Sequence, residues 1–253
     1  MNYFFGIKTK NIYSNITIPR FNNDGNTNKE YLLCKANIKN ATWNIEVLNN
    51  NKINDDFYLI EENISNNENI FFLAKQGEID NFNKKKLINF NNFTDTSPSY
   101  RSNLKINLKN GGFSSYQSEY PFSMINRRGS ILSSISALLN IEAEENKVFI
   151  KNIYEEPIHQ KFNLFFVDIK EKKILEKFEM KTNYTNMIDV KKEIIKPEIF
   201  LITDNFIGVP LFVSIKDKHL SFEHTHPPHE YIMSQDKYHK IAELKKEISE
   251  IIT

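Results

Sequence analysis

The chain has little cysteine and little glycine, and each shortage argues against a class of protein. Cys34 is the one cysteine among 253 residues, so a disulfide framework within the chain is excluded and a reducing compartment is expected. Only seven glycines are present, and neither a glycine-rich phosphate-binding loop nor a Gly-Xaa-Ser-Xaa-Gly elbow occurs. The sequence therefore argues against nucleotide-driven enzymes and serine hydrolases of the common folds.

Long apolar runs and concentrations of positive charge are also missing. No stretch reaches the about 18 apolar residues of a membrane span, and residues 1–13 lack the pattern of a secretory signal. Lys and Arg total 33 against 32 Asp and Glu, and the longest basic run is the KKK of residues 84–86. We therefore expect a cytoplasmic protein that binds neither nucleic acid nor a membrane.

What the chain does contain is the residue set of a soluble globular protein with a compositional skew. It is 40% hydrophobic and 26% charged. Asn, Lys, Ile, Phe and Tyr are abundant, as in proteins from AT-rich genomes, while arginine occurs only four times. Where lysine is the common cation, a retained arginine suggests a role that needs the planar guanidinium group. Arg101, Arg127 and Arg128 lie close together in the sequence.

The first part of the chain, residues 1–105, has the pattern of a small β region. Short runs rich in β-branched and aromatic residues alternate with Asn-rich turns. The candidate strands are residues 2–9, 11–18, 30–38, 41–48, 56–61 and 69–74. The third and fourth of them flank "KNAT" and are expected to form a hairpin.

The second part, residues 106–253, predicts a sandwich-like domain with a C-terminal helix. It begins with a polar segment, residues 109–134, which is either a long structured loop or a set of bulged strands. Seven candidate strands follow: residues 147–154, 161–169, 173–181, 186–190, 198–203, 209–216 and 219–224. Residues 234–252 place apolar side chains at helical intervals, and residues 129–145 suggest a second, short helix. The predicted fold class is mainly β.

Three of the six histidines lie in "SFEHTHPPHEYI", residues 221–232. Side chains alternate between the two faces of a strand, so Leu220, Phe222, His224 and His226 should share one face. The two imidazoles would then leave the end of a buried face, with α-carbons about 6.7 Å apart. Two histidines at this spacing suit one metal ion.

The residues that follow offer further metal ligands. Two prolines at residues 227–228 force a bend that would bring His229 or Glu230 back toward the histidine pair. Two histidines with a carboxylate or a third histidine suit Zn or non-haem Fe(II). Over these seven residues the spacing resembles the first metal motif of cupins, but the glycine expected before it is Lys218 and the later motif is missing. The alternatives are histidines that hydrogen-bond to main chain, and a metal-free acid–base or anion site.

A second candidate site lies in the polar segment of residues 109–134. Tyr116 offers an aromatic face with a hydroxyl group, Gln117 and Glu119 offer directional hydrogen bonds, and Arg127 or Arg128 would clamp a carboxylate or phosphate. Tyr120 would add a second ring. Such a set suits a sugar or a sugar acid. The other interpretation is a connector whose tyrosines cover the edge of the sandwich.

Two functions follow from these motifs. In the first, the protein binds a divalent metal, Zn or Fe, as a cofactor. With this metal it acts on or binds an oxygenated small molecule, either carbohydrate-like or a carboxylate. The second is a non-catalytic module without metal that binds a glycan or another protein, or that assembles. The sequence decides neither between enzyme and binding protein nor the oligomeric state.

Overall fold

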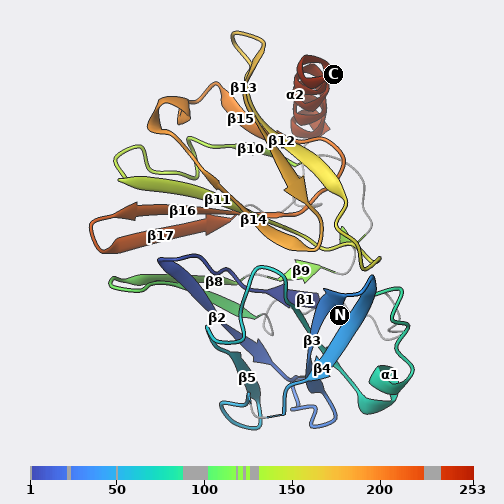
Figure 1. Cartoon of the computed structure of the whole chain (residues 1–253). Helices are drawn as coiled ribbons and strands as arrows, with labels where there is room; N and C mark the ends of the chain where they lie inside the picture. Colours follow the sequence, from blue (N-terminus) through green and yellow to red (C-terminus); the bar gives the residue numbers. More distant parts are fainter. Residues whose placement is uncertain are drawn as a thin grey trace.

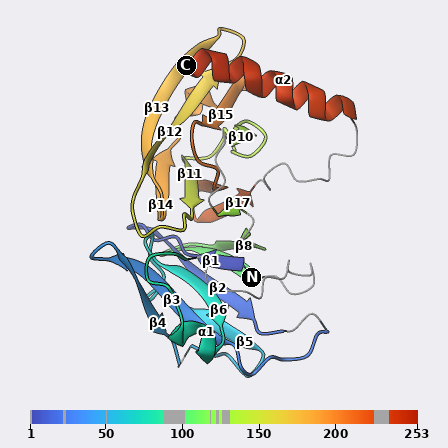
Figure 2. The same cartoon turned by 90° about the vertical axis from the view of Figure 1, so that its right-hand side faces the viewer.

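The computed structural model describes residues 2–21, 24–49, 51–87, 102–117, 119–121, 124–125, 131–224 and 235–253. Within these ranges the protein is mainly β, with four antiparallel sheets and a C-terminal helix, which confirms the predicted fold class. Figures 1 and 2 show the N-terminal sheets stacked on the C-terminal sheets.

Two of the sheets come from the N-terminal half. In spatial order, the first sheet contains β4 (Thr42–Val47), β3 (Leu32–Lys39), β6 (Ile70–Ala74), β1 (Asn2–Phe5) and β9 (Tyr120–Pro121). The second contains β5 (Phe57–Ile60), β2 (Ile12–Pro19), β7 (Asn103–Leu108) and β8 (Phe113–Gln117). All six strands expected before residue 75 are present. The polar segment of residues 109–134 contributes β8 and β9 to these sheets and β10 (Leu132–Ser134) to another, while its other described residues lie outside strands.

The hairpin of β3 and β4 is confirmed, and its turn has a local cause. Asn40 and Ala41 have φ angles of 51° and 52°, the left-handed conformation that a two-residue type I′ turn requires. Asparagine adopts this conformation more readily than most residues. A short helix that the sequence analysis did not predict, α1 (Gln76–Asp80), follows β6.

The C-terminal half forms the other two sheets and confirms all seven strands predicted there. The third sheet contains β14 (Tyr184–Asp189), β11 (Glu145–Asn152), β16 (Val209–Lys216) and β17 (His219–His224). The fourth contains β10 (Leu132–Ser134), β15 (Ile199–Thr203), β12 (Lys161–Asp168) and β13 (Lys173–Lys181). A 3-10 helix, Lys192–Ile194, precedes β15. Helix α2 (Gln235–Ile252) confirms the predicted C-terminal helix.

The prediction of a short helix within residues 129–145 is wrong. The described part of this range forms β10, which pairs with β15 through Ser133 and Leu201, and then a series of turns. Ile131, Ile135 and Leu139 are all buried, and their spacing of four residues imitates one face of a helix. These three residues reach the same core, but one precedes a strand and the others lie in turns, so their spacing does not come from a helix.

The third sheet is the central layer of the molecule, and its two inner strands, β11 and β16, are buried on both faces. Seven of the eight residues of β16 are buried. Val148 and Phe212 belong to the core shared with the fourth sheet, whereas Phe149 and Leu211 belong to the core shared with the N-terminal sheets. The sequence of a strand that is covered on both faces is a continuous apolar run and does not alternate between apolar and polar residues.

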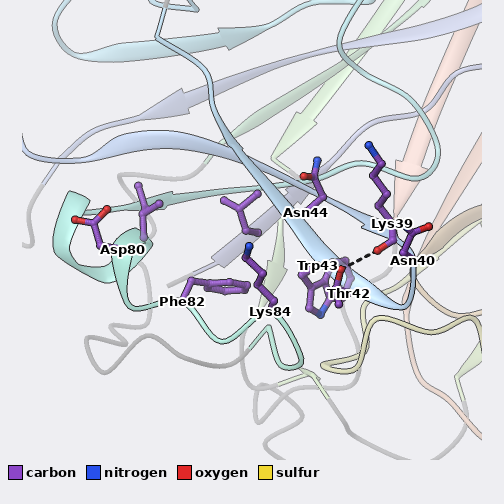
Figure 3. Close-up of a pocket in the computed structure, with 10 residues that line it drawn as sticks. Lys39, Asn40, Thr42, Trp43, Asn44, Asp80, Phe82 and Lys84 are labelled. Atoms are coloured by element: carbon purple, nitrogen blue, oxygen red, sulfur yellow. Dashed lines mark hydrogen bonds between the residues drawn. The ribbon is translucent and has the colours of Figure 1, made fainter.

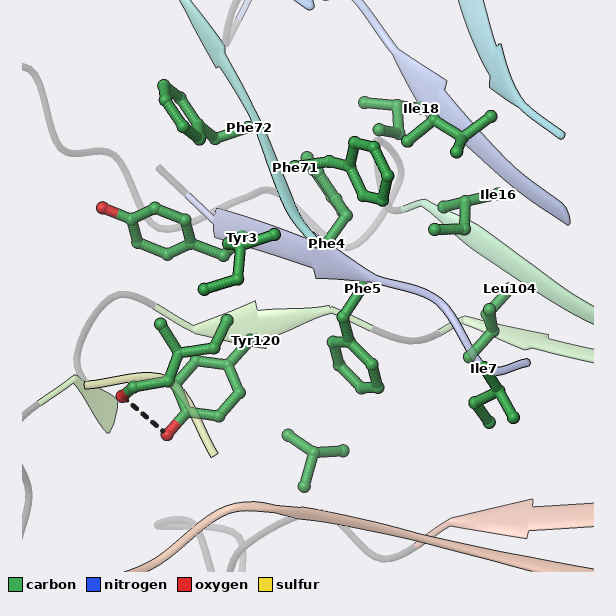
Figure 4. Close-up of a cluster of buried hydrophobic side chains, with 14 of the residues drawn as sticks. Tyr3, Phe4, Phe5, Ile7, Ile16, Ile18, Phe71, Phe72, Leu104 and Tyr120 are labelled. Atoms are coloured by element: carbon green, nitrogen blue, oxygen red, sulfur yellow. Dashed lines mark hydrogen bonds between the residues drawn. The ribbon is translucent and has the colours of Figure 1, made fainter. Parts of the chain in front are cut away.

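The largest core joins the two halves of the chain. Figure 4 shows Tyr3, Phe4 and Phe5 of β1 in this core, together with residues of β6, β2, β7 and β9. The same core includes Val213 and Phe222 of the third sheet. On the opposite side of the molecule, Ile248 of α2 packs against Phe165 on the outer face of the fourth sheet (Figure 2). The stack therefore runs from the N-terminal sheets through the third and fourth sheets to α2.

Candidate ligand site at the edge of strands β8 and β17

His224 lies on the face of β17 that the alternation of side chains predicted. Leu220 and Phe222 are buried, whereas Ser221 and Glu223 are exposed. His224 shares the face of the buried pair and is itself partly buried. This face of β17 packs toward β8 of the second sheet (Figure 1).

Strand β8 brings Tyr116 to the same place. Tyr116 is in register with Leu104 of β7, a core residue, so its ring lies on the face of the second sheet that meets β17. The centroid of the Tyr116 ring is 3.9 Å from that of His224, with 55° between the ring planes. Phe222 lies behind this pair, its ring centroid 6.4 Å from that of Tyr116 in an edge-to-face arrangement. The two candidate sites of the sequence analysis therefore share a point of contact.

The two rings differ in their exposure to solvent. Tyr116 is 38% exposed, so a molecule in solution reaches its ring and hydroxyl group. Both nitrogens of the His224 ring are buried. Solvent therefore reaches the tyrosine ring but neither nitrogen of the histidine ring.

The other ligand residues proposed for the polar segment are only partly described. Gln117 follows Tyr116 on the same strand, so its exposed side chain points to the opposite face of the sheet. Glu119 is partly buried. Tyr120 lies fully buried in the core, with its hydroxyl oxygen 3.4 Å from the carbonyl oxygen of Ile153, so its ring does not line a surface pocket. Arg101, Arg127 and Arg128 lie outside the described residues.

Of the four predicted metal ligands, the structure describes only His224. His226, His229 and Glu230 lie outside the described residues. In the described ranges no group of three His, Cys, Asp or Glu side chains is close enough to hold one metal ion. The imidazole of His159 is engaged elsewhere, since its Nδ1 atom lies 2.7 Å from the carbonyl oxygen of Thr182.

The chain has no match among protein-family models, curated proteins or solved structures. Among the described residues, no helix has the length and apolar character needed to cross a membrane.

Lys151 is the one lysine that is buried among the described residues, and it was not among the functional residues expected from the sequence. It lies on β11, in the apolar run "VFIKNIY", and is 0% exposed. Its Nζ atom donates to the carbonyl oxygens of Asn67, at 3.1 Å, and Asn69, at 3.5 Å. Burial lowers its pKa from 10.5 to about 7, and the nearby Glu68 carboxylate only partly opposes this effect. A lysine in the middle of an apolar strand was the signal available in the sequence.

Proposed function

We propose that this protein binds an oxygenated small molecule, a carbohydrate or a carboxylate, where β8 meets β17. The observation that supports the proposal is the contact between Tyr116 and His224, which come from the two motifs that the sequence analysis selected independently. An accessible tyrosine ring presents an apolar face to a sugar or an acid, and its hydroxyl group supplies a directional hydrogen bond.

In this proposal a divalent metal, Zn or Fe, binds at His224. His226 with His229 or Glu230 would complete the ligand set, since these residues follow His224 within six positions of the sequence. A metal at this place would polarise an oxygen atom of the ligand. Arg127 or Arg128 would pair with a carboxylate of the ligand.

Metal binding is tested by elemental analysis of the purified chain after incubation with Zn²⁺ and removal of excess ion. We expect about one zinc per chain for the native protein. The double variant His224→Ala/His226→Ala should retain its fold and lose the zinc. His219→Ala is the matched control because His219 begins the same strand but is exposed. Zinc retained by the double variant, or a native chain that takes up none, would refute the metal part of the proposal.

Ligand binding is tested separately with a panel of monosaccharides, disaccharides and small carboxylic acids, using ligand-observed NMR. Tyr116→Ala should weaken binding of any compound that the native chain binds. Gln117→Ala is the control, because Gln117 points away from Tyr116 on the same strand. If both variants bind as the native chain does, or if no compound binds, the site is not at this edge.

A second candidate function, a metal-free module that binds a glycan or protein or that assembles, has its own observation. Phe113 on β8 is 60% exposed, and Nζ of Lys105 lies 3.7 Å from the centroid of its ring. Such an exposed aromatic ring on an outer strand is a typical contact residue of a protein interface. Sedimentation at increasing concentration should show self-association that Phe113→Ser abolishes. A monomer at all concentrations would exclude assembly of this kind.

A further inference from the structure

A groove of about 290 Å³ lies between the β3–β4 hairpin and helix α1, and it shares no residue with the β8–β17 site. The hairpin supplies one wall, including Lys39, Asn40 and Asn44, and the segment from α1 onward supplies the other, including Asp80, Phe82 and Lys84. Figure 3 shows Asp80 at one end of the groove and Lys39 with Asn40 at the other, with Phe82 and Lys84 between them.

The base of the groove is held in place by hydrogen bonds from Trp43. Its main-chain N–H donates to the carbonyl oxygen of Lys84 at 2.8 Å, which ties the hairpin to the opposite wall. Its indole N–H donates to the carbonyl oxygen of Glu155 at 2.7 Å, in the C-terminal half of the chain. Trp43 is 1% exposed, so it forms the base and its position is fixed. The groove is therefore formed before any ligand arrives.

The positive charges of the groove have no carboxylate partner within the described part of the chain. Lys39 and Lys84 are both exposed and neither forms an ion pair there. Neighbouring lysines do form ion pairs: Lys35 with Glu46, Lys75 with Glu30 and Lys86 with Glu155. Two lysines that line one groove and have no carboxylate partner among the described residues favour an anion there. At the far end the carboxylate of Asp80 accepts a hydrogen bond from Gln76 and disfavours an anion there.

Apolar side chains occupy the space between the two ends. Ile45, Ile79 and Phe82 are each partly buried and line the groove. From this arrangement we propose that the groove binds a small molecule consisting of a flat apolar body joined to a phosphate or carboxylate. The apolar body lies against Phe82 and the two isoleucines, and the anionic group lies toward Lys39 and Lys84. The amide side chains of Asn40 and Asn44 line the same end, whereas the Thr42 hydroxyl already donates to the carbonyl oxygen of Lys39 at 2.8 Å.

The chain carries its own reporter for this site, because Trp43 is the only tryptophan. Its single indole N–H resonance in a ¹H–¹⁵N spectrum needs no assignment. Titration with phenyl phosphate should shift this resonance saturably, with a Kd in the millimolar range expected for a fragment of this size. Inorganic phosphate lacks the apolar body and phenol lacks the charge, so each should bind several-fold more weakly.

The matched variants separate a site from general attraction to a basic surface. Lys39→Gln/Lys84→Gln should weaken phenyl phosphate binding about tenfold, the effect expected for removing two partly exposed charge contacts. Lys85→Gln should leave it unchanged, because Nζ of Lys85 bonds the carbonyl oxygen of Ala41 and does not line the groove. An unchanged melting temperature shows that each variant is folded.

Three results would overturn the proposal. The first is the absence of a saturable shift of the Trp43 resonance at concentrations up to about 20 mM. The second is equal binding of phenyl phosphate and inorganic phosphate. The third is equal weakening by the double variant and by Lys85→Gln, which would indicate unspecific charge attraction.

Discussion

Protonation of Lys151 should make the free energy of unfolding of this protein depend on pH. The substitution Lys151→Met should remove this contribution. In the folded chain the pKa of this buried lysine is about 7, against 10.5 when it is solvated. At pH values between these two, the unfolded chain carries a proton on Lys151 that the folded chain does not. The free energy of unfolding therefore rises with pH across this window.

The size of the effect follows from the two pKa values. At pH 6 the shift destabilises the folded chain by about 5 kcal/mol, and at pH 9 by about 2 kcal/mol. Lys151→Met removes this proton linkage and keeps most of the side-chain volume. It also removes the hydrogen bonds to the carbonyl oxygens of Asn67 and Asn69, at a cost of about 1–3 kcal/mol that does not depend on pH. We therefore expect the variant to be the more stable protein at pH 6 and about equal to the native chain at pH 9.

The assay is urea unfolding followed by Trp43 fluorescence at several pH values from 6 to 9. The quantity to compare is the difference in unfolding free energy between the native chain and Lys151→Met, which should change by about 3 kcal/mol over this range. Lys147→Met is the control on the same strand. Lys147 pairs with Glu145 and its pKa is raised, so it stays protonated in both states throughout the window. A constant difference for Lys151→Met would refute the reasoning.

Two further predictions test the backbone and the core. Gly208→Ala should destabilise the chain by about 1–3 kcal/mol, because a Cβ atom there would lie 2.5 Å from the carbonyl oxygen of Lys151. Gly77→Ala in α1 meets nothing within 4 Å and should stabilise by about 0.5–1 kcal/mol; urea unfolding that ranks the two variants the other way would contradict both. Cys34 is fully buried and burial raises its pKa to about 12, so a thiol reagent at pH 8 should react only as fast as the chain unfolds. Rapid labelling of the folded protein would show that this part of the core opens.

Short-range patterns in the sequence determined the strands and their faces. Phe162, Leu164 and Phe166 alternate in the sequence, and all three are buried in the core between the third and fourth sheets. The same alternation placed His224 on the face of Phe222. These properties are predictable because the period of a strand is local and each face meets one environment. Ile131, Ile135 and Leu139 have a helical spacing but do not form a helix, because the first precedes a strand and the other two reach the core from turns.

The sites themselves depended on contacts between distant parts of the chain. Nothing in the sequence near Tyr116 or His224 indicates that their rings meet, because the contact requires the second sheet to lie against the third. Trp43 likewise becomes the base of a groove only through bonds to Lys84 and Glu155. The sequence alone determined that Lys151 interrupts an apolar strand. Its burial was decided by the tertiary structure, because a sheet covered on both faces leaves a side chain in its middle no route to water.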